Sequence, residues 1–517
     1  MKLFNISLLT YLTLLSLSLV FLLSSCIDED LNVDSNRPSS VQTPSLLVTA
    51  QKQIIDNVRS ESASLRSTAL FTQQISMVTY TSQSRYDIPF SYSEDIWGGL
   101  YKALNNLQEI IILNSDDETK DLVTADGAGR NSTQIAISRI LKSYAFYALT
   151  DIFGNVPYHS YGSDDPEFEA LQQEEDNLTP GYASQEKIYA DILNELKEAA
   201  DILLEYQAET TFGSSDIIYA GKNLSWAKFA NSLRLRFATR LKDKNPDLYN
   251  IHFSDALAKG VFTSNADNAI FKYSTSAPNE APYYRATVTA NRRDFAISKP
   301  FIDLLKGENA QLAIADPRIS KFAAVNSNGE YVGLPYGLAD SEAGSFPATA
   351  VSLPGTIYSA PDFGEVLMEY SEVAFLQSEY NGWSQAEYVN GVRASLEKWG
   401  VSTSDANTYI ASLPAANQRN VLNQKYIALF TQFLEVWSEY RRTGFPDFLI
   451  KTGDIIYSGP INGGEATYTF NPLFGDGGIP SRLYYPVKEQ SVNLQSYQEA
   501  VGKQGNDVIE TKLWVFK

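Results

Sequence analysis

The only cysteine of this 517-residue chain, Cys26, lies directly after an apolar segment at the N-terminus. Lys2 supplies a positive charge, and residues 8–23 are apolar except for small or hydroxyl-bearing side chains and Tyr11. This order is typical of a bacterial secretory signal, and the segment is too short, with the wrong flanks, for a transmembrane span. Because no second cysteine exists, the chain cannot form an internal disulfide, and a hydrophobic core must supply its stability.

The tetrapeptide Leu23-Ser24-Ser25-Cys26 resembles a lipobox. That resemblance implies removal of residues 1–25 and a diacylglycerol on the sulfur of Cys26, whereas the alternative is ordinary signal cleavage with a buried thiol. The acidic stretch Asp28-Glu29-Asp30 resembles a surface-export signal of Bacteroidetes-type bacteria. We therefore expect a chain anchored by its lipid to the outer membrane and facing the extracellular side.

The composition is that of a globular protein, with 44% hydrophobic and 20% charged residues. The formal net charge is −20, and removing residues 1–25, whose only charged side chain is Lys2, makes it −21. An acidic surface without any Lys/Arg-rich block repels phosphate backbones and anionic headgroups. Nucleic acid is thereby excluded as a partner, and membrane attachment depends on the lipid.

Helical periodicity dominates the rest of the chain after a polar, Pro- and Ser-containing tether at residues 26–45. The apolar stripes are Ile137, Leu141, Tyr144 and Ala148; Ile188, Ile192, Leu196, Ala199 and Leu203; and Trp226, Phe229, Leu233 and Phe237. Two further helical patterns cover 366–380 and 421–437. Between them, Ser384-Gln385-Ala386-Glu387 predicts a capping box, and Gly400 predicts the end of that helix.

Two long segments, 263–293 and 323–363, are rich in Asn, Ser, Gly, Pro and Tyr and lack this periodicity. Loops of such length in a compact domain usually bind something or carry short strands. A third irregular segment, 453–487, is glycine-rich and is also expected to contain strands. We therefore predict a helical scaffold at 46–260 and 364–450, with loop-rich, ligand-binding insertions at 261–363 and 451–490.

Six segments in order resemble the SusD/RagB family of nutrient-binding outer-membrane lipoproteins, in particular its SusD-like branch. They are Tyr147 to Tyr158 (YALTDIFGNVPY), Trp226 to Arg236 (WAKFANSLRLR), Ala315 to Arg318 (ADPR), Tyr370 to Glu379 (YSEVAFLQSE), Glu435 to Pro446 (EVWSEYRRTGFP) and Ile479 to Pro486 (IPSRLYYP). The family motifs themselves are expected to be structural, because Glu439 lies three residues before Arg442 and Asp316 two before Arg318, which suits ion pairs.

The resemblance implies a mainly α fold of tetratricopeptide-like helical pairs, with long irregular loops and a few short strands. It also implies a non-catalytic surface lipoprotein. Such a protein binds an extracellular nutrient, usually a glycan, and delivers it to a TonB-dependent transporter of the SusC type.

Aromatic and arginine side chains in loop contexts are the candidate ligand-binding groups, because a flat ring packs on the C–H face of a sugar while polar groups bind its hydroxyls. The candidates are Tyr80, Arg85, Tyr86, Trp97, Tyr283, Tyr284, Arg292, Tyr336 and Tyr358. The competing interpretation is that these rings fold back into the core, as Trp97 would if it belonged to a helix with Tyr101 and Leu104.

Catalysis is the weaker alternative. Glu365, Glu369, Glu372 and Glu379 fall on one helical face, and a close carboxylate pair can hydrolyse glycosides, but one face offers no cleft between the acids. The two histidines, His159 and His252, belong to no metal-binding or catalytic motif. We predict no cofactor and no metal, although calcium bound by loop oxygens leaves little sequence trace.

We thus expect a neutral oligosaccharide as ligand, since the negative surface does not steer anionic polymers, although a local arginine pair would reverse that preference. Two alternatives remain open. One is a peptide ligand, because tyrosine-rich loops serve peptides equally well. The other is a non-catalytic helical scaffold in a surface protein complex.

Overall fold

The computed structural model describes residues 42–124, 127–172, 178–309, 311–461 and 463–517. The signal segment, Cys26 and most of the predicted tether lie outside the described residues. Thr43–Lys517 forms one compact unit. Its first helix begins at Thr43, slightly before the tether boundary expected at residue 45. Within the described ranges, no helix combines the length and the apolar character needed to cross a membrane.

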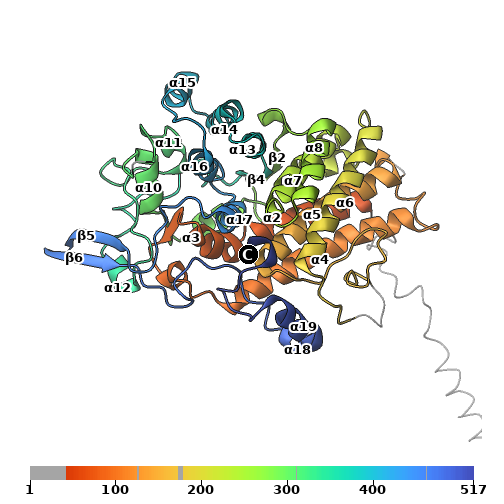
Figure 1. The fold of residues 1–517 in the computed structure, drawn as a ribbon, viewed down its shortest axis with the longest axis horizontal. Helices are drawn as coiled ribbons and strands as arrows, with labels where there is room; N and C mark the ends of the chain where they lie inside the picture. Colours follow the sequence, from red (N-terminus) through yellow and green to blue (C-terminus); the bar gives the residue numbers. More distant parts are fainter. Residues whose placement is uncertain (1–41, 125–126, 173–177, 310, 462) are drawn as a thin grey trace, which may run out of the picture. The chain divides into compact units, whose positions relative to one another are not determined.

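Successive long helices pack side by side over the first half of the domain (Figure 1). They are α2 (Thr43–Val58), α4 (Phe90–Ser115), α5 (Asn131–Phe153), α6 (Gln185–Glu205), α7 (Asn223–Arg240) and α8 (Pro246–Lys259). The three predicted stripes lie in α5, α6 and α7, and every one of their residues is buried. Apolar periodicity therefore located these helices correctly.

A second helical group follows the irregular middle of the chain. It comprises α13 (Tyr370–Tyr380), α14 (Gln385–Lys398), α15 (Thr403–Ala411), α16 (Gln418–Ala428) and α17 (Phe433–Thr443). Phe375, Tyr388, Val392, Tyr409 and Val421 form a separate apolar cluster there. The mainly α fold is confirmed.

Two of the predicted helical patterns were too long. Residues 366–368 belong to strand β4 (Gly364–Met368), because they pair with β2 (Ala269–Lys272), and the helix starts only at Tyr370. The pattern 421–437 is interrupted after Ala428, where Thr431 takes a left-handed backbone conformation with φ 81°. The residues before and after this turn both bury an apolar stripe. The apolar periodicity therefore continues through the turn and does not reveal it.

The predicted capping box also forms differently. Helix α14 begins after Ser384 as expected, but the Ser384 hydroxyl donates to the Glu387 carboxylate and accepts no amide. The C-terminal turn is as predicted: Gly400 has φ 67°, and the Val401 amide donates to the Leu396 carbonyl at 3.0 Å.

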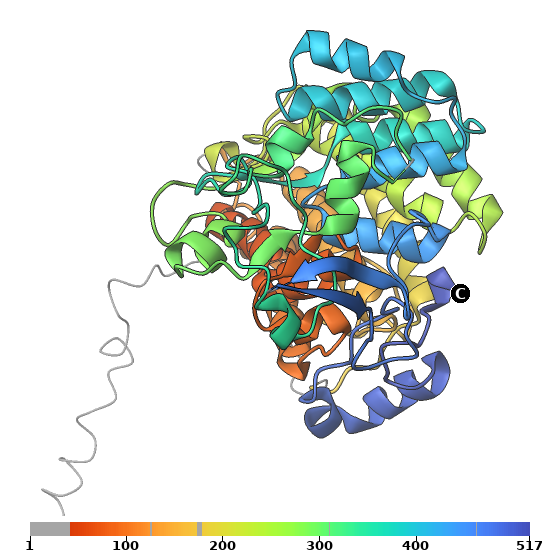
Figure 2. The ribbon, with the colours of Figure 1, turned by 90° about the vertical axis from the view of Figure 1, so that its left-hand side faces the viewer.

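The remaining elements are short, as the loop-rich segments predict. The short helices are α3 (Ala69–Phe71), α9 (Pro282–Tyr284), α10 (Lys299–Lys306), α11 (Ile319–Phe322), α12 (Asp340–Ala343), α18 (Glu489–Val492) and α19 (Leu494–Gln504). The other helical turns are η2 (Glu61–Thr68), η3 (Thr81–Arg85), η5 (Gly213–Ser215), η6 (Asn265–Asp267), η7 (Arg285–Thr289) and η8 (Trp514–Phe516). Besides β2 with β4, two antiparallel pairs occur: β1 (Ile75–Met77) with β3 (Phe295–Ile297), and the hairpin β5 (Ile455–Ile461) with β6 (Gly464–Thr469) (Figure 2).

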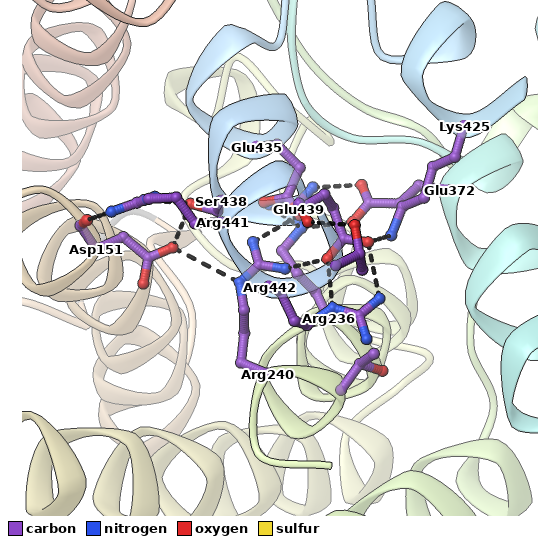
Figure 3. A network of polar contacts seen from close by, with 12 residues as sticks. Asp151, Arg236, Arg240, Glu372, Lys425, Glu435, Ser438, Glu439, Arg441 and Arg442 are labelled. Atoms are coloured by element: carbon purple, nitrogen blue, oxygen red, sulfur yellow. Dashed lines mark hydrogen bonds and ion pairs between the residues drawn. The ribbon is translucent and has the colours of Figure 1, made fainter. Parts of the chain in front are cut away.

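A buried ionic network joins α5, α7, α13, α16 and α17 (Figure 3). Arg240 on α7 donates to Glu435 at 2.7 Å and to Glu439 at 2.6 Å, and Arg236 donates to Glu372 at 2.7 Å. The predicted pair of Glu439 with Arg442 forms within this network at 3.0 Å. The ion pair predicted between Glu439 and Arg442 is thus confirmed, and it is part of the buried core.

The pair of Asp316 with Arg318, also predicted from the sequence, lies elsewhere in the core. The Arg318 Nε donates to the Asp316 carboxylate at 2.9 Å, and both side chains are buried. The guanidinium also reaches Ser395 on α14 and Gln424 on α16. This turn therefore ties the irregular middle of the chain to the second helical group.

Candidate ligand-binding site

The short β1–β3 pair brings together two predicted ligand residues that are far apart in the sequence. Met77 pairs with Phe295, and one residue further the Val78 amide donates to the Asp294 carbonyl at 2.7 Å. This register places Tyr80 beside Arg292. We call the surface formed by Thr79, Tyr80, Arg292, Asp294, Glu61 and Arg66 the Tyr80 face.

Tyr80 presents an exposed ring, with 64% of the residue accessible to solvent. The Arg292 guanidinium lies 5.8 Å from the ring centroid, within the range of a cation–π contact. The backbone of Tyr80 is left-handed, with φ 55° and ψ 49°, a conformation that is costly for a residue other than glycine. Left-handed backbone also occurs in the core, at Tyr86, but here it holds an aromatic ring at the surface, and strained residues cluster at functional sites.

The charges behind the ring are paired with one another. Arg292 contacts the Asp294 carboxylate, and its Nη1 lies 3.6 Å from Glu61 Oε1. Arg66 donates to the same two carboxylates, at 2.9 Å to Asp294 and 2.5 Å to Glu61. Thr79 completes the set by donating its hydroxyl to Asp294 at 3.0 Å. The face consequently offers hydrogen-bonding groups without an unpaired cation.

Two π-helical segments frame this face. Glu61 is the first residue of η2, whose start is capped by Ser60. Arg292 follows η7, and its amide donates to the Thr287 carbonyl at 2.7 Å. Because π-helical turns are rare and recur at functional sites, their meeting at one surface supports its assignment as a site.

The arrangement suits recognition of a polyhydroxylated ring. The Tyr80 ring offers an apolar surface, and the partly exposed side chains of Arg292 (37%) and Glu61 (31%) supply a donor and an acceptor beside it. Burial raises the pKa of the neighbouring Tyr92, and Arg66 opposes the shift, so this phenol stays protonated as a further donor. No group of three metal-ligating side chains occurs among the described residues.

Comparison with known proteins identifies the family. A family profile described as "Starch-binding associating with outer membrane" matches residues 35–468. The chain belongs to the SusD-like family. The description names starch binding and association with the outer membrane. SusD-like proteins are therefore binding proteins rather than enzymes.

Solved structures of similar fold are SusD homologues. A chitin-binding homologue from Flavobacterium johnsoniae is 24% identical, with TM-score 0.71 over 91% of this chain and 99% of that chain. A homologue from Parabacteroides distasonis is 23% identical, with TM-score 0.74 over 92% of this chain and 98% of that chain. At these identities the likeness shows the fold alone. No curated protein sequence matches this SusD-like chain.

Five of the nine predicted ligand residues are buried in the SusD-like core rather than displayed. Tyr86 and Tyr336 each pack on Phe470, with ring centroids 5.6 Å apart. Tyr283 stacks on Tyr358 at 4.3 Å.

Trp97, the fifth, lies in α4 and faces inward. It contacts the rings of Tyr101, Phe153, Tyr182 and Tyr485. The core interpretation weighed for Trp97 is therefore the one that the structure supports. Trp97 is buried because it lies on the inner face of a helix, whereas the four tyrosines are buried because the irregular segments fold back onto the helices.

The other four predicted residues are accessible to different degrees. Tyr80 and Arg292 meet at the Tyr80 face, whereas Arg85 and Tyr284 are half-buried. Sequence reasoning missed Glu61, Arg66, Thr79 and Asp294, because polar residues of these types occur throughout the chain. Only the exposed, left-handed tyrosine would have pointed to them, and backbone conformation cannot be read from residue types.

The glutamates considered for catalysis are structural in this SusD-like fold. Glu365 lies in β4 and Glu369 in extended backbone, so the four do not share one helical face. Arg236 pairs with Glu372, and Arg442 pairs with Glu379 at 2.7 Å. Both histidines are equally structural, since His159 contacts Lys142 and His252 contacts Arg234.

Two surface hollows lie away from the Tyr80 face and contain none of the predicted ligand residues. One, of about 960 Å³, is lined by Arg130, Tyr206 and Glu209 among others. The other, of about 400 Å³, lies between Tyr182 and helix α19. In the first, Arg130 is paired with Glu209 at 2.8 Å and its guanidinium lies 4.5 Å from the centroid of the Tyr206 ring, so a paired arginine on a tyrosine occurs there as well.

Proposed function

We propose that this SusD-like chain binds an oligosaccharide at the Tyr80 face and delivers it to a partner TonB-dependent transporter of the SusC type. The observation that carries the proposal is the exposed, conformationally strained Tyr80 ring backed by Arg292. A ring of this kind packs on the C–H face of a pyranose, while the adjacent polar groups bind hydroxyls. The starch-binding family description and the chitin-binding neighbour support a glycan as the ligand.

A neutral saccharide fits the charges of the face better than an acidic one. Each of the two arginines contacts carboxylates, so neither retains a free positive charge for a uronate or sulfate group. Two unpaired arginines could have attracted an anionic ligand in spite of the negative surface. Because both arginines are paired with carboxylates, no such attraction is expected. Burying a sugar carboxylate here would add a third negative charge to Glu61 and Asp294.

We also propose that a lipid on Cys26 holds the domain at the extracellular side of the outer membrane. The lipobox-like tetrapeptide supports the anchor, and the family description supports the membrane. Modest affinity suits such a role, because the ligand must be released to the transporter and repeated units on a polymer raise the effective concentration. A Cys26→Ser variant should leave the membrane fraction, which cell fractionation would detect.

The ligand assignment is tested by titrating the chain from Ile27 onward with maltoheptaose and chitohexaose in a calorimeter. Replacing Tyr80 by Ala should weaken binding of the active saccharide about two- to tenfold, since an aromatic contact contributes about 0.5–1.5 kcal/mol. Tyr161→Ala is the matched control. Its ring is also exposed (38%) and also lies on an arginine, with Arg139 at 4.8 Å, but it belongs to a different surface.

Equal losses in the two variants, or none in Tyr80→Ala, would exclude the Tyr80 face. A glycan and peptide array decides between the ligand classes. Saturable peptide binding without any glycan binding would identify a peptide receptor, and binding of neither would favour a structural scaffold. Co-purification of a TonB-dependent receptor with the full-length chain from its native membranes tests the delivery partner, and its absence would count against delivery.

A further inference from the structure

The turn η3, which directly follows Tyr80, is bracketed by two strained residues. Tyr80 precedes it with φ 55° and ψ 49°, and Tyr86 follows it with φ 70° and ψ 18°. Both are left-handed tyrosines, and such a conformation is rare for a residue with a bulky side chain. Two of them within seven residues mean that the conformation of η3 is imposed by its surroundings rather than preferred by its own backbone.

The same turn contains a run of polar atoms that lack hydrogen bonds within the described structure. They are Thr81 Oγ1, Gln83 Oε1, Ser84 Oγ and Arg85 Nε. Thr81 and Ser84 are each only 1% exposed. Since buried polar groups in folded proteins are almost always paired, four exceptions within the five residues of one turn beside a candidate site call for a specific cause.

Hydrogen bonds connect η3 to the rest of the fold at its two ends. At the first residue, the Thr81 amide donates to Asp340 at 2.8 Å. At the last, the Arg85 carbonyl accepts from the Leu473 amide at 2.7 Å. Beyond the turn, the Tyr86 ring is packed against Phe71 and Phe470. The turn therefore has fixed ends and a strained, poorly paired interior.

We propose that η3 rearranges when a saccharide occupies the Tyr80 face, and that Thr81, Ser84 and Arg85 then bind hydroxyl groups of that ligand. This inference rests on the proposed function. Two hydroxyls and a guanidinium supply donors and acceptors in the mixture that a neutral polyol requires. A ligand that pairs these groups binds the rearranged turn more tightly than the free one, which is the differential affinity that drives a conformational change.

Two threonine variants test the unpaired state of the turn. Thr81→Val removes a hydroxyl that has no partner, so we expect the unfolding midpoint to rise, by on the order of 1 °C for a domain of this size. It should also weaken saccharide binding about fivefold, because the hydroxyl is used only in the complex. Thr72→Val is the matched control: Thr72 is equally buried, but its hydroxyl donates to the Ala69 carbonyl at 3.1 Å. That variant should lower the midpoint and leave the affinity unchanged.

Hydrogen exchange tests the rearrangement itself. With saturating maltoheptaose or chitohexaose, whichever binds, exchange of the amides of residues 80–87 should change by about tenfold, while those of β1 and β3 stay constant. A lower midpoint in Thr81→Val, or binding without any exchange difference in 80–87, would overturn the inference and leave the proposed function intact. Loss of the Tyr80 dependence would overturn both.

Discussion

The buried network around Arg240 and the Tyr80 face are built from the same groups but are exposed differently. In each, two or more arginines form ion pairs with carboxylates. The side chains of Arg240 and Glu435 are 0% and 4% exposed, whereas those of Arg292 and Glu61 are 37% and 31% exposed. An ion pair between arginine and glutamate or aspartate therefore does not by itself indicate whether these residues serve folding or ligand binding in this protein.

Burial decides what each set of charges can do. In the network every charge has left water, so each is committed to its protein partners, and removing one strands another. At the Tyr80 face the Arg292–Glu61 pair remains hydrated and contributes little to folding, whereas the Arg66–Asp294 pair behind it is only 8% and 9% exposed. Burial assigns the network to folding, recognition by the partly exposed pair is our proposal, and the following variants test that division.

The largest effect is expected from Arg240→Met. The substitution removes one cation from the buried network, so that Glu435 keeps only Arg236 and Glu439 only Lys425 and Arg442 as ion-pair partners, and breaking a buried ion pair costs about 3–5 kcal/mol of unfolding free energy. Chemical denaturation monitored by circular dichroism measures the loss. A change below about 1 kcal/mol, the range of an exposed pair, would remove the energetic distinction between the two regions.

Acid should weaken the network around Glu435. Burial opposes ionisation of Glu435, but Arg236 and Arg240 outweigh it and lower its pKa to about 2. Its ionised form thus stabilises the fold fully above about pH 4.3, the unfolded value, and that stabilisation is lost as the pH falls toward 2. The stability difference between the protein and Glu435→Gln should accordingly shrink between about pH 4.3 and pH 2.

Glu365 provides a control of opposite sign. Burial raises its pKa to about 7, although Arg59 partly opposes the shift. The folded state therefore favours the protonated form, and stability declines as the pH rises from about 4.3 through 7. Glu365→Gln should remove that decline. Parallel pH profiles for the two variants would contradict the assignment.

A smaller effect is expected from Arg292→Met, and it should appear in binding rather than in stability. Losing the charged donor beside Tyr80 should weaken saccharide binding about tenfold, while unfolding changes by less than about 1 kcal/mol. Arg130→Met is the matched control, since Arg130 also forms an exposed pair, with Glu209, and also lies on a ring, that of Tyr206. Equal affinities in the two variants would show that Arg292 has no part in recognition.

The smallest effect concerns backbone strain at Tyr80. Asn tolerates left-handed backbone better than Ala, so Tyr80→Asn should be more stable than Tyr80→Ala by about 0.5–1 kcal/mol. Both variants lose the ring and should lose saccharide binding equally. Identical unfolding midpoints would mean that the left-handed conformation of Tyr80 is not a cost in the free protein.

Apolar periodicity predicted helices correctly where a single apolar stripe of the helix faces the core. The stripes in α5, α6 and α7 were correct because burial of an apolar face is a local pattern repeated every three or four residues. It failed at β4, where Val366 and Leu367 are buried by pairing with a strand almost 100 residues earlier, and at Thr431, where a turn separates two buried halves. Each failure involves a contact or a backbone angle with no local signature.

The same limit explains the site. Loop-like composition suggested exposed tyrosines, but Tyr283 and Tyr358 find each other across the irregular middle of the chain and become core. Their exposure depended on how the loops fold back, which residue types do not encode.

By itself the sequence determined the helical fold class, the family and the structural ion pairs of its motifs, because these follow from local spacing and residue type. Only the tertiary structure decided which aromatic residues remain at the surface. Tyr80 and Arg292 lie more than 200 residues apart, and they meet because β1 and β3 pair in one register. Long-range pairing of backbone groups, and the burial that accompanies it, is a property of the whole fold rather than of any segment.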